Sequence, residues 1–561
     1  MRSSFTMGRS QPVSVPLLFL PLLLCSSSLS FGFVSAAGTA DGSEEWGYVQ
    51  VRPKAHLFWW LYRSPQRIDT GSSPWPTLLW LQGGPGGSGV GIRNFQEIGP
   101  LDTDLRHRNS TWLQKADLLF VDNPVGTGYS FVEDESLFVR TDWEAATDLT
   151  TLLKKLYDED ESRQRSPLFI VAESYGGKFA VTAGLSILKA IEAGELKLKL
   201  GGLALGNSWI SPEDFVFSWG PLLQDVSRLD IKDAVKSNIM AEKIRQEIKK
   251  GEYGNATNSW DELEEFISSS SNDVDFYNFL RDSGSDPISL AAVEVPRRLS
   301  MKIYPTYLSS KASSVSTDIS SLMNGVIKDK LKIIPKTVSW GGQAGLVFEA
   351  LADDFMKPRI HEVDELLSLG ISVTIYNGQV DLICASKGTE SWVQKLKWEG
   401  LKTFNYMDRK PLYCDSQGMA VTKGFLKSYQ NFRFYWILGA GHFSLTSSSG
   451  GKPCVLPPAR QPDMTPPVTP ELTRTRPLAM ARLIEERGSA ALPSKDDEEA
   501  FRTPTSEESK LPSVAPSCPP APTKSRRVLQ CKRKLWPGPA SVAAGEGQLL
   551  GKKRRVSIAA D

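Results

Sequence analysis

Short apolar runs recur along the first three quarters of the chain, and polar or helical segments separate them. Continuous runs of this length are typical of strands that are buried on both faces of a sheet. Between two runs, Asp142–Tyr157 carries Trp143 and five aliphatic residues at helical spacing, with Thr141 available as a cap. The alternation predicts an α/β fold, with a mostly parallel central sheet flanked by helices. The predicted strands are Thr77–Leu81, Asp117–Val121, Pro167–Ala172, Leu200–Leu205, Ile371–Tyr376 and Phe432–Leu438.

The alternation fails between about residues 211 and 336. This segment is long, polar and rich in helix-forming residues. It reads as an inserted helical cap, and substrate pockets often form under such insertions. The predicted α/β domain therefore spans residues 37–445 and includes the cap.

The composition changes again after about Leu445. Residues 446–561 contain 17 of the 36 prolines and lose the apolar periodicity, so we expect a disordered, Pro-rich and basic tail. Its basic clusters, Lys524–Lys534 and Lys552–Arg555, resemble nuclear-import patches. Solvent-exposed charged residues are the simpler interpretation, because the chain begins with a predicted secretory signal peptide, described next.

The N-terminus has the three parts of a secretory signal peptide. Arg2 and Arg9 precede the apolar stretch Val13–Leu24, and small residues lead to a cleavage position near Ala36. We predict that residues 1–36 are a signal peptide, because two prolines and a serine run make this stretch a poor membrane span. The mature protein is then expected without a membrane anchor, secreted or delivered to a lysosome or vacuole.

Other features agree with this route. The sequons at Asn109 and Asn255 are candidate glycosylation sites. Lys and Arg total 65 against 64 Asp and Glu, a balance that argues against a nucleic-acid partner or an anionic membrane. Cysteines are sparse, so the fold must be held by its core and not by a disulfide scaffold.

Ser174 has the strongest chemical signal in the chain. The apolar run Leu168–Ala172 leads through Glu173 to this serine, and Gly176 follows two positions later. A small-x-Ser-x-Gly pattern after a buried strand is typical of a nucleophile elbow, a tight turn that exposes the serine hydroxyl. An ordinary strand-to-helix turn with an exposed serine gives the same pattern, so partners must be found.

A serine nucleophile needs a histidine base and an acidic residue that orients it. In α/β folds with a nucleophile elbow, the chain order is Ser, then Asp or Glu, then His. Of the four histidines, His442 follows a predicted strand and lies in a glycine-rich turn. Asp381 lies just after the predicted strand Ile371–Tyr376, where it can orient an imidazole. A helix cap is the other interpretation of Asp381.

An oxyanion hole needs backbone N–H groups. One is expected from Tyr175, directly after the serine. The glycine-rich loop Trp80–Ser88 follows a strand and is a candidate for the other. A phosphate-binding loop is disfavoured because no lysine follows the glycines.

With these stretches in place, the chain resembles the serine carboxypeptidases, and most closely the retinoid-inducible type. The resemblance runs in order over roughly residues 45–443. It rests on Trp80–Ser88, Glu97–Pro100, Val121–Ser130, Glu173–Gly177, Gly206-Asn207, Asn377–Asp381 and Gly441-His442.

The resemblance implies an α/β-hydrolase fold and the release of single C-terminal residues from peptides or proteins, often at acidic pH. It implies Ser174, Asp381 and His442 as the triad. It also implies Gly84 and Tyr175 as oxyanion donors. The substrate's terminal carboxylate would be held by four residues: Gln82, Gly83, Glu97 and Glu173. No metal or cofactor is expected.

Substrate binding by Glu97 and Glu173 is expected to depend on pH for a physical reason. A carboxylate bonds to another carboxylate only if they share a proton. If the two glutamates share one, substrate binding weakens as pH rises and the pair ionises.

The resemblance is lost one residue after His442. The chain reads Phe443-Ser444-Leu445 and continues into the Pro-rich tail, whereas the family continues into a final helix. An alternative exon, a retained intron or a wrongly assigned gene end would explain the change. Two alternatives to an active carboxypeptidase stay open. One is a hydrolase-fold protein whose catalysis is impaired because the final helix is missing. The other, independent of the tail, is an acyltransferase on the same scaffold.

Overall fold

The computed structural model describes residues 34–68, 74–158, 160–283, 319–416 and 419–443. The chain divides into two units, residues 1–464 and 465–561. The second unit and the predicted tail from residue 446 lie outside the described residues, as does most of the predicted signal peptide. The fold below is that of the first unit.

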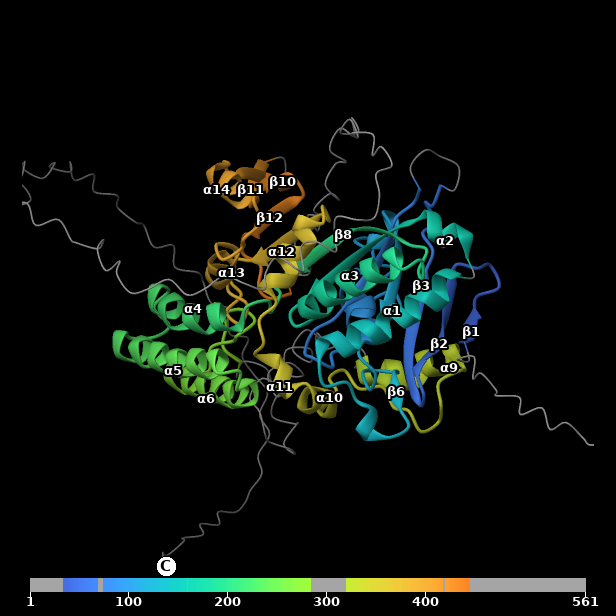
Figure 1. Cartoon of the computed structure of the whole chain (residues 1–561), viewed down its shortest axis with the longest axis horizontal. Coiled ribbons are helices and arrows are strands. Elements are labelled where there is room, and N and C mark those ends of the chain that lie inside the picture. The colour runs from blue at the N-terminus through green and yellow to red at the C-terminus, as the bar shows by residue number, and fades with distance from the viewer. Residues whose placement is uncertain (1–33, 69–73, 159, 284–318, 417–418, 444–561) are drawn as a thin grey trace, which may run out of the picture. The chain divides into compact units, whose positions relative to one another are not determined.

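One mixed sheet forms the centre of this unit (Figure 1). In the described part it has 12 strands in the order β1-β2-β3-β5-β4-β7-β8-β9-β12-β11-β10, with β6 beside β3. The strands are β1 (Val34–Gly38), β2 (Glu44–Arg52), β3 (Ala55–Tyr62), β4 (Thr77–Leu81), β5 (Asp117–Val121), β6 (Phe131–Val132), β7 (Pro167–Glu173), β8 (Lys199–Gly206), β9 (Val373–Gly378), β10 (Lys410–Ser416), β11 (Met419–Tyr429) and β12 (Phe432–Ile437).

All six predicted strands are present, within two residues at each end. They form the parallel centre of the sheet, β5-β4-β7-β8-β9-β12. Both edges are antiparallel, β1-β2-β3 on one side and β12-β11-β10 on the other. The sheet is therefore parallel only at its centre. This is the usual place for parallel strands, which are generally buried on both faces.

The helices of the described part are α1 (Asp142–Asp158), α2 (Glu161–Arg165), α3 (Gly176–Glu192), α4 (Pro212–Asp225), α5 (Ile231–Lys249), α6 (Tyr253–Ser271), α8 (Ile319–Leu322), α9 (Lys328–Leu331), α10 (Gly345–Ala350), α11 (Ala352–Phe355), α12 (Ile360–Ser368), α13 (Ser386–Val393) and α14 (Leu401–Tyr406). Four further helical turns are η1 (Gly89–Ile98), η2 (Trp112–Gln114), η3 (Glu135–Leu137) and η6 (Met323–Ile327).

Helices α1 and α3 lie side by side across one face of the sheet (Figure 1). The predicted stripe of α1 is buried from Ala146 to Leu156. Trp143 was wrongly counted with it: its exposed fraction is 39%. It lies in the first turn, where the stripe has not yet reached the sheet.

The segment between β8 and β9 is helical, as expected of an inserted cap. Helices α4, α5 and α6 pack together beside the sheet (Figure 1), and short helices follow from residue 319. In the described part, residues 207–283 and 319–372 lie between β8 and β9, and the last helix of this segment, α12, packs on α3 and β9. This insertion supplies much of the wall of the site described next.

Strand β1 lies across the predicted cleavage position. It pairs residues 34–38 with β2 at the sheet edge, so cleavage after Ala36 would remove three of its five residues. In the part of the chain that the structure describes, no helix combines the length and apolarity needed to cross a bilayer.

Candidate active site

Ser174 lies in the sharp turn between β7 and α3. Its φ is 60°, a left-handed conformation that a non-glycine residue adopts only when its surroundings hold it there. A methyl group at Gly176 would lie 2.3 Å from the carbonyl oxygen of Leu81, and one at Gly177 would lie 2.4 Å from the side chain of Ser208. The small residues after the serine are therefore required by close packing, as the elbow pattern predicts.

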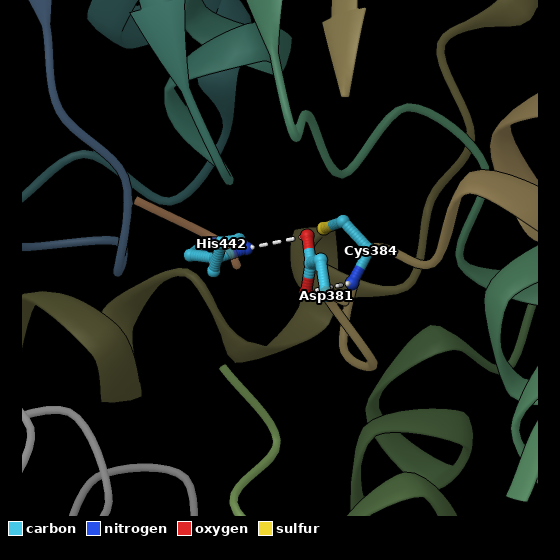
Figure 2. A group of neighbouring side chains, drawn as sticks. All are labelled: Asp381, Cys384 and His442. Carbon is cyan, nitrogen blue, oxygen red and sulfur yellow. Dashed lines mark hydrogen bonds and ion pairs between the residues drawn. The ribbon is translucent and has the colours of Figure 1, made fainter. Parts of the chain in front are cut away.

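Asp381 and His442 meet at the carboxyl ends of two neighbouring parallel strands, β9 and β12 (Figure 2). Asp381 Oδ2 lies 2.9 Å from His442 Nδ1, and both side chains are fully buried. Because a carboxylate only accepts, Nδ1 carries the proton and Nε2 is the basic nitrogen. Nε2 is buried and has no hydrogen-bond partner among the described residues, Ser174 included.

Asn207 anchors the aspartate, a role that the sequence analysis did not identify. Its Nδ2 donates to Asp381 Oδ2 at 2.5 Å, and its Oδ1 accepts from the N–H of Gly378 at 3.3 Å. The other carboxylate oxygen accepts from the N–H of Cys384 at 3.2 Å. The carboxylate is therefore fixed on both oxygens.

The loops that carry the two residues are tied together. The N–H of Val380 donates to Ala440, and a methyl group at Gly378 would lie 2.2 Å from the carbonyl oxygen of Gly441. The cap also holds the histidine loop. The N–H of His442 donates to the carbonyl of the cap residue Tyr277 at 2.8 Å. Tyr277 is a second positioning residue without a recognisable sequence motif.

Asp381, Cys384 and His442 could also be considered as metal ligands, since their ligand atoms lie within 4.8 Å of one another (Figure 2). Two observations disfavour this. Nδ1 of the histidine already donates to the aspartate, and burial raises the pKa of the Cys384 thiol well above its ordinary value, so it stays protonated. The arrangement instead suits a histidine base held by an aspartate.

The glycine loop after β4 lies against the nucleophile turn. A methyl group at Gly83 would lie 2.6 Å from both the Ser174 Cβ and the Tyr175 nitrogen. At Gly84, where φ is +119°, a methyl group would meet the side chain of Gln343 from the cap at 2.7 Å. The loop thus brings Gly84 and Tyr175, the two predicted oxyanion donors, to the same side of the serine.

A pocket opens at this point. Gly84, Ser174 and Tyr175 line its floor. Its walls are mostly aromatic and come largely from the cap: Trp209, Trp260, Tyr277, Gln343, Phe348, Phe355 and Ile383. The position of the insertion over the serine agrees with the pocket expected there.

A buried ionic network holds Tyr175 from behind. Its hydroxyl donates to Asp354 at 2.8 Å, and Lys178 donates to the same carboxylate at 3.0 Å. Arg359 pairs with Asp354 and Asp142. Burial lowers the pKa of Lys178, and the two aspartates oppose that shift. The network therefore fixes the side chain of Tyr175, one of the two predicted oxyanion donors.

The residues predicted to bind the terminal carboxylate of the substrate also lie together. They surround a residue that the sequence analysis missed. Arg93 forms ion pairs with both Glu97 and Glu173, and its Nε donates to Gln82 Oε1 at 2.6 Å. All four side chains are buried. An arginine that the sequence analysis did not anticipate therefore contacts both glutamates. The spacing of Arg93 and Glu97, four residues apart, was the only local signal.

Asn109 and Asn255, the two predicted glycosylation positions, are both exposed. Of the remaining histidines, His56 lies in β3, His107 is exposed and His361 lies in α12. His442 is therefore the histidine that faces an acidic partner at the carboxyl edge of the sheet.

Two family models match the chain. The model of serine carboxypeptidases matches residues 35–450. A model of cyclin-dependent protein kinase inhibitors matches residues 474–539, which lie outside the described part.

Known proteins give the same result for the larger region. Serine carboxypeptidase-like 51 of Arabidopsis thaliana is 60% identical over 412 residues, 72% of this chain and 89% of that protein. The retinoid-inducible serine carboxypeptidase of Mus musculus is 45% identical over 428 residues, 76% of this chain and 94% of that protein. A crystal structure of Kex1(delta)p, a prohormone-processing carboxypeptidase from Saccharomyces cerevisiae, shares the fold with a TM-score of 0.58 and 22% identity, over 72% of this chain and 88% of that one. The chain belongs to the serine carboxypeptidase family.

Proposed function

We propose that Ser174, His442 and Asp381 release C-terminal residues from peptides through an acyl-enzyme. The observation that carries the proposal is the buried Asp381–His442 pair, whose Nε2 has no partner, beside a cavity lined by Ser174. A histidine held in this tautomer can take a proton from a serine hydroxyl and return it to a leaving amine.

In the proposed mechanism, Ser174 Oγ attacks the carbonyl carbon of the last peptide bond while His442 takes its proton. The N–H groups of Gly84 and Tyr175 stabilise the oxyanion that forms. His442 then protonates the departing amine, and the terminal amino acid leaves. Water, deprotonated by His442, releases the shortened peptide from the serine.

Gln82, Gly83, Glu97 and Glu173 are proposed to bind the terminal carboxylate of the substrate. Their supporting observation is that they lie together, at the ends of β4 and β7 and in η1. The acyl part of the substrate would occupy the aromatic cavity. Activity at acidic pH is part of the proposal.

We propose a secretory route for the carboxypeptidase region, with residues 1–36 as its signal and glycans on Asn109 and Asn255. The exposure of both asparagines supports this. Delivery to a lysosome or vacuole would place the enzyme in an acidic compartment. Removal of N-glycans from secreted material tests the route: the mass shift should be smaller in Asn109→Gln and absent when Asn255→Gln is added.

Labelling with a fluorophosphonate tests the nucleophile. The folded protein should form one adduct on Ser174, because only a serine with an activated hydroxyl reacts readily. Absence of the adduct would favour a hydrolase fold with impaired catalysis. Product analysis separates the second alternative: transfer of the acyl group to an added alcohol in place of water would identify an acyltransferase.

Residues 474–539 support a second, separate candidate function, binding to a cyclin-dependent kinase complex, on the strength of the family match alone. A kinase partner and a secretory signal belong to different compartments, which agrees with the change of composition after His442. Antibodies to the two halves would detect the same band if a single chain is made. Transcript reads across the codons for Phe443 and Ser444 would test the junction directly.

A further inference from the structure

A short segment of the cap, just before α10, pairs with the glycine loop that follows β4. Gly87 of the loop and Gln343 of the cap are partners in an antiparallel bridge. Beside them, Trp340 Nε1 donates to Ser88 Oγ at 2.9 Å. The cap therefore holds the loop that carries Gly84, one of the two predicted oxyanion donors.

The side-chain amide of Gln343 has a defined orientation in this contact. Its Nε2 donates to the carbonyl of Pro85 at 2.5 Å. A carbonyl oxygen only accepts, so the contact identifies the nitrogen and leaves Oε1 as the other end of the amide. Oε1 lies close to Gly84, because a methyl group built on that glycine would be 2.7 Å from it. Gln343 also lines the pocket, together with Ser174 and Tyr175.

Oε1 of Gln343 is an acceptor without a donor. The atom is buried, and no group in the described part of the chain donates a hydrogen bond to it. A buried acceptor without a donor is unfavourable, and in the wall of a substrate pocket the missing donor can belong to the substrate. The terminal torsion of a glutamine is soft, so a small rotation of the amide turns Oε1 towards a bound peptide.

The proposed reaction determines which N–H of a peptide comes close to Oε1. The oxygen of the cut bond lies between the N–H groups of Gly84 and Tyr175. In the same substrate residue, the backbone nitrogen is only three bonds from that oxygen, so its N–H comes close to Gly84 as well. The N–H of the cut bond itself belongs to the leaving amine, which must face His442. An ionised terminal carboxylate has no hydrogen to donate.

We propose that Gln343 Oε1 accepts a hydrogen bond from the backbone N–H of the residue on the acyl side of the cut bond. Gln343 is then a substrate-binding residue supplied by the cap, and it aligns the scissile carbonyl with the N–H of Gly84. The inference rests on the proposed function. It defines the substrate class more narrowly, as peptides with an N–H at that position in preference to analogues with an oxygen atom or a proline there.

A purely structural role of Gln343 would have a different consequence. Gln343 and Trp340 both tie the cap to the glycine loop, so loss of either tie would disturb Gly84 and slow the cleavage of every substrate. Loss of a contact with the substrate N–H affects only substrates that carry this N–H. Two substrates that differ at this one group therefore separate the two roles.

The test compares the wild type with Gln343→Met and with the matched control Trp340→Phe. Methionine has nearly the length of glutamine but no amide oxygen, and phenylalanine removes the indole N–H that bonds to Ser88. One substrate is an N-acetylated dipeptide. The other is the same molecule with an ester oxygen in place of the N–H of its first residue. Release of the C-terminal amino acid gives kcat/KM for each.

The ratio of the two kcat/KM values is the relevant quantity. The preference for the N–H substrate should be about tenfold greater in the wild type than in Gln343→Met, because one hydrogen bond is replaced by two oxygens that face each other. Trp340→Phe should keep the ratio of the wild type even where both rates fall, since its Gln343 is intact.

Equal ratios in the wild type and Gln343→Met overturn the inference, and so does the same loss of preference in Trp340→Phe. A wild type that cuts the two substrates equally well also overturns it, whether or not the variants fold. In these three cases peptides are still cut, so the proposed function stands. If the wild type cuts neither substrate, the proposed function itself fails, and the inference fails with it.

Discussion

Asp381 Oδ2 lies 2.9 Å from His442 Nδ1, with both side chains fully buried at the ends of adjacent parallel strands. The pair places the proton of the imidazole on Nδ1. This leaves Nε2 basic, as a proton acceptor for a serine must be.

Asp381→Asn should lower kcat by about 10³- to 10⁴-fold, because the amide cannot hold the histidine in the required tautomer. KM for a blocked dipeptide should change little, since the residues proposed to bind the terminal carboxylate are untouched. Steady-state kinetics at fixed pH check both values. A variant with kcat within tenfold of the wild type would show that Asp381 only caps the following segment.

Asn207→Ala should remove a hydrogen bond to a buried carboxylate, a contact that typically contributes about 1.5–3 kcal/mol. We expect kcat to fall about tenfold or more, because the aspartate is held less firmly. A double-mutant cycle with Asp381→Asn provides the control. The second substitution should then cost little, as residues that act as a unit are not additive. Additive losses would contradict a role through Asp381.

Gly83→Ala should abolish activity, with a loss of more than about 100-fold, because the added methyl group would press on the serine and on the Tyr175 N–H. Gly341→Ala is the matched control. That glycine has no atom within 4 Å of an added methyl group and does not need a left-handed backbone. Its activity and melting temperature should match those of the wild type, and equal losses in the two variants would contradict the packing argument.

Asp122 makes stability depend on pH. Burial raises its pKa from 3.8 to about 6 in the folded protein, against opposing hydrogen bonds from Ser88, Tyr129 and Val90. The folded state therefore binds a proton more tightly than the unfolded state. Between about pH 4 and 6 the free energy of unfolding should fall as pH rises, by up to about 3 kcal/mol.

Urea unfolding at several pH values measures this effect. Asp122→Asn should lose that part of the slope, so the difference between the two proteins is the relevant quantity. A wild-type stability that rises with pH relative to the variant over the same interval would contradict the assigned direction.

The centre of the fold and the order of its candidate triad could be predicted because both are local in the sequence. A buried parallel strand is a continuous apolar run, and the candidate residues lie just after three such runs. The strands β10 and β11 gave no such signal. They form the last two strands at one side of the sheet, with β10 at the edge, and they are partly exposed and mix polar with apolar residues.

The rest of the site depends on long-range contacts. Arg93 pairs with Glu173, Asn207 binds Asp381, and the cap residue Tyr277 binds the backbone of His442. None of these partners is near the other in sequence, and buried charged or polar residues break the apolar pattern on which sequence analysis depends. The candidate residues could thus be named from the sequence, but not their long-range partners Arg93, Asn207 and Tyr277.

Digestion of an unmodified peptide by the purified protein, beside Ser174→Ala, tests the central claim most directly. Mass spectrometry should show successive loss of single residues from the C-terminus with the wild type and an intact peptide with the variant. Equal shortening by both proteins, internal cleavage, or an intact peptide with the wild type would contradict a serine carboxypeptidase that acts through Ser174.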